Sequence, residues 1–162
     1  MFSKRRSSRS AISIALCATC ALATLAATAQ ETLTPAEVVD AFNGAIDRGD
    51  RTAALSLMTR DATVLEMGFA DRSRSDYEGL HLSLDIQFAK TTERTLISRR
   101  QGGEDELHWV ASLYLDEGEF QGEPVEQPTA ETVLLRRVAG RWRIAHLHWS
   151  SPAAPSAETA AP

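Results

Sequence analysis

The chain has 162 residues, with 17 Lys and Arg against 22 Asp and Glu. Four of the basic residues fall in the first nine positions and every acidic residue follows position 30, so the rest of the chain has a net charge of −9. This acidity argues against nucleic acid as a partner, because binding to phosphates needs a basic face. The roughly 130 residues after the first 29 are the size of one ordinary domain that folds without metal or disulfide support.

The first 29 residues have the three-part organisation of a secretory signal peptide. A basic stretch from Lys4 to Arg9 precedes an apolar run from Ala11 to Leu25, and a small-residue site ends at Ala29. The apolar run is about 15 residues, shorter than the roughly 20 that a bilayer demands. We therefore expect cleavage after Ala29, a periplasmic or secreted product, and no membrane association after the signal is removed.

Both cysteines, Cys17 and Cys20, lie inside this leader, so the mature chain is expected to have no thiol. Thiol catalysis, disulfides and thiolate metal sites are thereby excluded from the folded part. At the other end, residues 151–162 hold three prolines and no large apolar side chain. This segment cannot bury enough surface to offset its ordering entropy and is predicted to be a disordered tail. The domain is predicted to span residues 30–150.

Two helices are predicted at the start of this domain. Thr34 as N-cap and Glu37 three residues later form a capping box, and Gly49 is placed to end the first helix. Apolar residues recur along it at helical spacing: Val38, Val39, Phe42, Ala45 and Ile46. A shorter helix is expected from Asp50, with inward residues Ala54, Leu55 and Met58.

A third helix is predicted from about Ser75 to Ala89, after a strand over residues 62–67 and a turn over 68–72. Its inward stripe, by helical arithmetic, mixes polar and apolar groups: Tyr77, His81, Leu84, Asp85 and Phe88. Polar groups on a face that should be buried mark this helix as a candidate for function.

Everything after residue 91 is predicted to be a meander of strands. They cover residues 92–101, 107–116, 129–138 and 141–150, with turns rich in Gly or Pro between them. Helices first and long antiparallel strands afterwards indicate an α+β domain in which the helices cover one face of the sheet.

Alternation along the last strand decides which side chains share a face. With a period of two, one face carries Trp142, Ile144, His146, His148 and Ser150. The two imidazoles then point the same way, with Cα atoms about 7 Å apart at a rise of roughly 3.3 Å per residue. Paired histidines on an apolar strand face are uncommon, so both are candidate site residues.

With this order of elements, three motifs carry a resemblance to a known family. They are Glu37-x4-Phe42, Ser73-x3-Tyr77-x3-His81-x3-Asp85-x2-Phe88 and Trp142-x-Ile144-x-His146-x-His148-Trp149. The chain resembles the nuclear transport factor 2-like superfamily, and within it the SnoaL-like, ketosteroid-isomerase-like group of small bacterial proteins. The resemblance implies a cone-shaped, cystatin-like fold, with three N-terminal helices packed on a strongly curved antiparallel sheet, a pocket inside the cone, and frequent dimerisation through the sheet.

If the third helix covers the sheet as the resemblance implies, His81 and Asp85 face the two histidines of the last strand. The candidate catalytic residues are therefore His81, Asp85, His146 and His148. Glu66, Tyr77 and these four are the candidate ligand-binding residues.

Three interpretations of this cluster remain open. It can be structural, with each buried polar group satisfied by a neighbour. It can be a binding or acid–base pocket for a small organic molecule, in which a His–Asp pair holds one imidazole near neutral pKa. It can be a two-His-one-carboxylate site for a divalent transition metal, using His146, His148 and either His81 or Asp85.

We predict an exported, homodimeric pocket protein that binds a small organic ligand through this His/Asp cluster. The rival is a non-catalytic dimeric interaction module in which the cluster only stabilises the fold.

Overall fold

The computed structural model describes residues 32–152. The predicted signal peptide and the predicted tail beyond residue 152 lie outside these residues. Helices and strands follow one another as α1 (Pro35–Asp47), α2 (Arg51–Ser56), β1 (Met58–Glu66), β2 (Phe69–Asp71), α3 (Arg74–Gly79), α4 (Leu82–Ala89), β3 (Thr92–Glu104), β4 (Leu107–Phe120), β5 (Glu123–Val138) and β6 (Arg141–Ser150).

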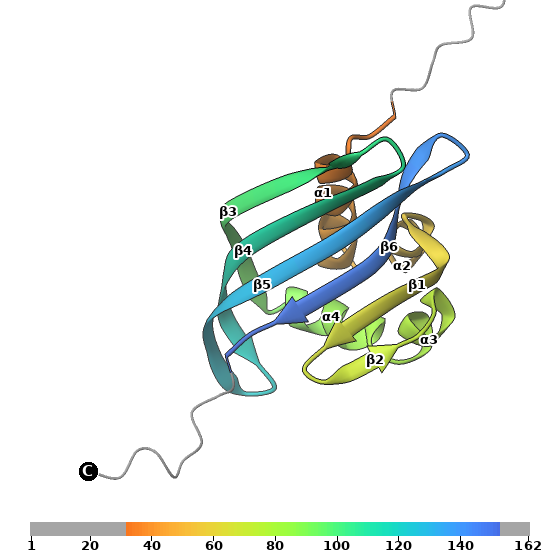
Figure 1. Ribbon diagram of the computed structural model, residues 1–162. Helices are drawn as coiled ribbons and strands as arrows, with labels where there is room; N and C mark the ends of the chain where they lie inside the picture. Colours follow the sequence, from red (N-terminus) through yellow and green to blue (C-terminus); the bar gives the residue numbers. More distant parts are fainter. Residues whose placement is uncertain (1–31, 153–162) are drawn as a thin grey trace, which may run out of the picture. The chain divides into compact units, whose positions relative to one another are not determined.

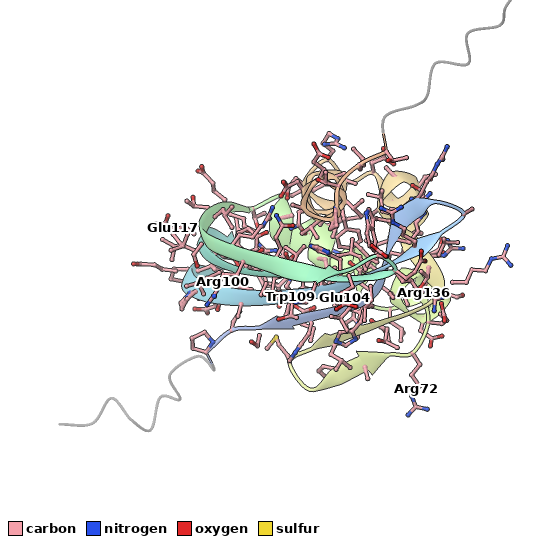
Figure 2. All side chains as sticks on the ribbon, turned by 45° about the horizontal axis from the view of Figure 1, so that its top comes forward. Arg72, Arg100, Glu104, Trp109, Glu117 and Arg136 are labelled. Carbon is pink, nitrogen blue, oxygen red and sulfur yellow. The ribbon has the colours of Figure 1, made fainter. Side chains whose placement is uncertain are left out.

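The strands form one curved sheet in the order β2-β1-β6-β5-β4-β3 (Figure 1). All neighbours are antiparallel except β1 and β6, which run parallel and are joined by a long connection that includes β2, the helices α3 and α4, and strands β3 to β5. Figure 2 shows the helices on one side of this sheet. The predicted α+β arrangement is confirmed, with one parallel pair in a sheet that was expected to be wholly antiparallel.

Helix α1 forms as its sequence predicts. The Thr34 hydroxyl accepts a hydrogen bond from the Glu37 N–H, and the Glu37 carboxylate accepts from the Thr34 N–H at 2.8 Å, so the capping box is complete. The five apolar residues predicted to face inward are all buried. Their burial against the sheet fixes α1 over the centre of the core, where it packs on β4 and β6.

The core fills the space between the helices and the inner face of the sheet. Its strand members alternate along β1, β4, β5 and β6, as expected for a sheet with one covered face. The core residues from the sheet are Met58, Ala62, Val64, Val110, Val133, Leu135, Trp142, Ile144, Leu147 and Trp149. Met58 was expected at the end of the second helix, but it begins β1.

The predicted third helix is interrupted. Helix α3 ends at Gly79, a residue that costs about 1 kcal/mol in a helix interior, and α4 begins after His81. The interruption changes the phase of the helical stripe. Leu82 and Ile86 are therefore buried, and Leu84, which was expected to face inward, is 45% exposed.

Strand β6 departs from the strict alternation predicted for it. Leu134 and Leu135 of β5 pair with His146 and Ile144 of β6, so Ala145 is an extra residue and forms a β-bulge. Beyond the bulge the alternation is reversed. Leu147 and Trp149 are buried in the core, and the histidines on either side of Leu147 lie on the outer face of the sheet.

No helix within residues 32–152 has both the length and the apolar character needed to cross a membrane.

Candidate functional site

A polar cluster gathers where the β1–β2 hairpin meets α3 and α4. The Tyr77 hydroxyl donates to Asp85 Oδ2 at 2.6 Å, and His81 Nδ1 lies 2.7 Å from Asp71 Oδ2. Glu66 lies close enough to Asp85 for the two carboxyls to affect each other's pKa. We call these five residues the carboxyl–imidazole cluster.

Local structure accounts for their convergence. Glu66 ends β1 and Asp71 ends β2, and the antiparallel pairing sets Asp71 beside Val64, two residues before Glu66 on the same face. His81 is the N-cap residue of α4, and Asp85 follows one turn later. The break between α3 and α4 thus gives both side chains access to the end of the hairpin.

The cluster is partly open to solvent. Tyr77 and Asp71 are fully buried, but the His81 side chain is 22% exposed, and Glu66 and Asp85 are half-buried. The polar atoms on one side of the cluster are therefore accessible, whereas the groups behind them are fixed by packing.

Burial and crowding of like charges set the protonation of the carboxyls. Burial, with the neighbouring charge of Glu66 as the next cause, raises the pKa of Asp85 from 3.8 to about 7. Burial also raises the pKa of Glu66. Two adjacent carboxyls cannot both ionise cheaply, so near neutral pH the Glu66–Asp85 pair retains a shared proton. The pKa of Tyr77 is raised well above 10, again chiefly by burial, so its hydroxyl stays a donor.

Asp71 orients the imidazole of His81. A carboxylate can only accept, so the 2.7 Å contact assigns the proton to Nδ1 and leaves Nε2 of a neutral ring as an acceptor. The Phe69 ring lies against the imidazole with 5.7 Å between the ring centroids. The cluster therefore combines a potential proton acceptor, His81 Nε2, with a protonated carboxyl pair that can donate.

His146 and His148 do not join this cluster. The bulge places both on the outer face of the sheet, where His146 Nδ1 lies 2.7 Å from the Thr63 hydroxyl of β1. Burial, and then the charge of His148, lower the pKa of His146. The prediction that these histidines face His81 and Asp85 around a common hollow is wrong, because it assumed unbroken alternation.

The predicted metal-binding set is not assembled either. Within residues 32–152, no group of three or more His, Cys, Asp or Glu side chains has an arrangement that could hold a metal ion. His81 and the outer pair lie on opposite faces of the sheet, so they cannot share one ion.

The sequence analysis did not identify Asp71, because this residue lay in a segment predicted to be a turn. It also did not identify two polar networks in the core. In the first network, Glu131 Oε2 accepts hydrogen bonds from Trp149 Nε1 at 2.9 Å and from Asn43 Nδ2 at 3.2 Å, and Glu131 Oε1 accepts one from Tyr114 at 3.2 Å. Glu131 is 1% exposed. Its carboxylate is satisfied by donors and sealed from solvent, so it acts in packing.

The second network joins β3, β4 and β5. Arg94 binds Asp116 through two hydrogen bonds of 2.7 and 3.1 Å, and the Thr129 hydroxyl donates to the same carboxylate at 2.7 Å. Asp116 is fully buried. A signal for both networks was present in β4, whose inward positions include Ser112, Tyr114 and Asp116 while its outward positions are apolar.

With this geometry in view, comparisons with known proteins decide the family. The SnoaL-like domain family matches residues 36–154, which is most of the chain. The chain belongs to the SnoaL-like domain family. A search of curated proteins found no match.

Solved structures support the same fold. A provisionally named ketosteroid isomerase from Shewanella frigidimarina NCIMB 400 is 27% identical, with a TM-score of 0.68 over 70% of this chain and 91% of the other. An NTF2-like protein with a cystatin-like fold from Novosphingobium aromaticivorans is 16% identical, with a TM-score of 0.59 over 75% and 81%. The association domain of C. elegans CaMKII is 17% identical, with a TM-score of 0.57 over 71% and 91%.

These likenesses confirm the predicted fold class. This SnoaL-like protein has the cystatin-like, NTF2-like architecture, with its helices packed on one face of a curved, unclosed sheet. Domains of this family suggest binding of a small ligand, but a shared fold does not determine an activity, which depends on the site itself.

Proposed function

We propose that this SnoaL-like protein binds a small organic ligand at the carboxyl–imidazole cluster and can transfer protons to and from it. The observation that carries the proposal is the contrast between two kinds of buried carboxyl. Glu131 and Asp116 are buried and bonded to donors, whereas Glu66 and Asp85 lie near each other with raised pKa values at a half-buried position. A solvent-accessible polar site whose carboxyl groups have raised pKa values is a typical place for a ligand to bind.

The groups of the cluster have complementary roles in this proposal. His81 Nε2 accepts a proton from a C–H or O–H group of the ligand, and Asp71 stabilises the imidazolium that forms. The Glu66–Asp85 pair donates its shared proton to an oxygen of the ligand. Tyr77 holds Asp85 in place through the 2.6 Å hydrogen bond. One proton enters and one leaves the protein, which is the balance of an isomerisation or a dehydration step.

The test uses native mass spectrometry and small-molecule extraction of the protein purified from its natural host. We expect a bound compound in the wild type and its loss in Asp85→Asn and His81→Ala. The matched control is the double variant His146→Ala/His148→Ala, which changes two imidazoles on the opposite face and should retain the compound. Equal retention by all variants would refute the proposed site.

We also propose that the protein is exported from the cytoplasm. The leader of residues 1–29 supports a periplasmic or secreted location. Full-length protein expressed in a bacterial host should appear outside the cytoplasm with an intact mass that begins at Gln30, whereas a variant without the leader should stay inside. Cytoplasmic full-length protein with an unprocessed N-terminus would contradict the export proposal.

We also propose a homodimer through the outer face of the sheet, which the apolar side of β4 supports. Leu107, Trp109 and Leu113 are exposed there, and Trp109 and Leu113 line a hollow of about 330 Å³ together with Arg100. Figure 2 shows Arg100 and Trp109 along the side of the sheet that faces away from the helices. A two-fold dimer would bury this patch on both copies at once.

Sedimentation analysis tests the dimer. The wild type should sediment as a dimer and Trp109→Glu as a monomer, while Thr52→Glu on the exposed side of α2 should leave the dimer intact. A monomeric wild type at high micromolar concentration would refute it. If the dimer forms but no variant of the cluster affects ligand content, the hypothesis of a non-catalytic interaction module replaces that of a ligand-binding protein.

A further inference from the structure

The carboxyl–imidazole cluster has more acidic groups than the protein neutralises. Glu66, Asp71 and Asp85 interact with one another, and the pKa values of Glu66 and Asp85 are raised further by the charge of Asp71. Their nearest basic group is His81, which carries a charge only when it is protonated. Arg94 also acts on Glu66, but both of its hydrogen bonds go to Asp116. The site therefore has an uncompensated negative charge that only proton uptake relieves.

A second observation concerns Asp71 alone. This residue is 1% exposed, and its Oδ2 binds His81, but its Oδ1 has no hydrogen-bond partner among the described residues. A buried carboxylate oxygen without a donor is costly, by more than a neutral polar atom would be. The Asp71 residue lies near the other carboxyls of the cluster, because its charge raises the pKa values of Glu66, Tyr77 and Asp85, and its Oδ1 remains without a donor. A donor from a ligand would satisfy it.

The surface beside the cluster is apolar and partly aromatic. Phe69 is 65% exposed and packs on the His81 ring, and Leu80 precedes His81 with its side chain exposed. Exposed apolar groups beside an acidic site favour a ligand with a cationic head and an apolar body, because the aromatic face also attracts a cation.

We propose that the ligand of the carboxyl–imidazole cluster is an organic cation, a primary amine on an aryl or alkyl body, whose ammonium group donates to Asp71 and to the Glu66–Asp85 pair. This inference rests on the proposed function, because it specifies the ligand class for that site. An ammonium group supplies three donors and one positive charge. Its binding releases the proton held by the carboxyl pair to solvent, so charge and protons balance. For a ligand of this class the pair therefore acts as a hydrogen-bond acceptor, in place of the proton donor described under the proposed function.

The experiment compares three probes of one shape by NMR titration of the mature chain: benzylamine, benzyl alcohol and benzoate. Benzylamine should bind about tenfold more tightly than benzyl alcohol or better, and benzoate most weakly. The preference for the amine should grow from about pH 6 to about pH 8, as the pair loses its proton. The groups that govern this titration are Glu66, Asp71, Tyr77, His81 and Arg94, which surround Asp85 from β1, β2, α3, α4 and β3.

Two variants locate the effect. Asp71→Asn keeps the shape of the site and should remove most of the preference for benzylamine. Because Asp71 is buried and its variant can fail to fold, Glu66→Gln at the half-exposed end of β1 provides a second measurement and should reduce the preference in the same direction. Glu78→Gln, an exposed residue of α3, is the control and should change nothing.

The possible failures are distinguishable. If benzyl alcohol or benzoate binds as tightly as benzylamine, and Asp85→Asn abolishes that binding, the cation inference is wrong and the proposed pocket stands. If MgCl2, CaCl2 or ZnCl2 displaces benzylamine at equimolar concentration, the site takes a metal ion and the amine assignment is also wrong. If no probe binds and Asp85→Asn leaves the natural ligand content unchanged, both proposals fall.

Discussion

Replacing Asp85 with Asn should stabilise the protein at alkaline pH and leave it nearly unchanged near pH 4. Asn has almost the same shape, its oxygen can accept the Tyr77 hydrogen bond, and its amide faces Glu66 without a negative charge. The substitution therefore removes the charge of Asp85 and preserves its contacts. At low pH, Asp85 is itself neutral, so little changes.

The sign and size follow from the raised pKa. Because folding raises the pKa of Asp85 from 3.8 to about 7, the folded state binds more protons than the unfolded state between these values. The stability contribution of this group is fully present below about pH 4 and is lost as the pH rises through about 7. The gap corresponds to about 4 kcal/mol at 1.36 kcal/mol per pH unit. We expect about 2 kcal/mol or more to appear, since solvent reaches this half-buried site.

Urea denaturation of the wild type and Asp85→Asn at about pH 4, 6 and 8 measures this free energy. The advantage of the variant should increase with pH and level off above about 7. Glu66→Gln should behave in the same way, because either change ends the repulsion, and Glu78→Gln should give no pH-dependent difference. A variant that is equally destabilised at every pH would show that Asp85 acts only as a structural acceptor, and our reasoning about the shared proton would be wrong.

Three further changes test the rest of the structure by chemical denaturation. Glu131→Ala should cost about 3–5 kcal/mol, because it strands the three donors that converge on the carboxylate, and a loss below about 1 kcal/mol would contradict its role. Gly118→Ala should cost more than about 1 kcal/mol, since φ is 150° and a Cβ would lie 2.3 Å from the Thr91 carbonyl oxygen; an unchanged midpoint would refute that contact. Deleting Ala145 should leave the protein folded, because it removes only the bulge. Deleting Ala111 from the regular ladder of β4 should unfold the protein, because every later side chain of the strand would then point to the opposite face. Unfolding by the Ala145 deletion would count against the bulge.

The fold could be predicted because its strongest local signals agree with its tertiary contacts. The capping box at Thr34 and the five apolar positions of α1 form as the sequence indicates. The strand predicted over residues 107–116 also forms, although β4 and β5 extend further into the predicted loops. These features depend on neighbours within a few residues, which a sequence displays directly.

The site could be predicted only in part, since its geometry depends on two local irregularities. Four of the six predicted ligand-binding residues come together: Glu66, Tyr77, His81 and Asp85. His81 follows the break after Gly79 and contacts Asp71, which was not among the predicted site residues. The extra residue at Ala145 moves the other two histidines to the far face. A bulge leaves little trace in a hydrophobic pattern, and its position is decided by the pairing of β5 with β6.

The bulge also explains why the interior can hold so many polar groups. If β6 alternated strictly, His146 and His148 would enter the core, and Leu147 and Trp149 would face outward. The indole N–H of Trp149 would then lose Glu131, whose carboxylate would be buried without its shortest hydrogen bond. That loss would cost several kcal/mol, far more than a local bulge. The core therefore satisfies its central carboxylates with its own donors.

At the hairpin end, Glu66 and Asp85 repel each other and Asp71 keeps an oxygen without a donor, which weakens the fold. A neutral amide at position 85 would relieve that repulsion, so the acidic pair does not serve to stabilise the fold, and we propose that it serves binding or chemistry instead.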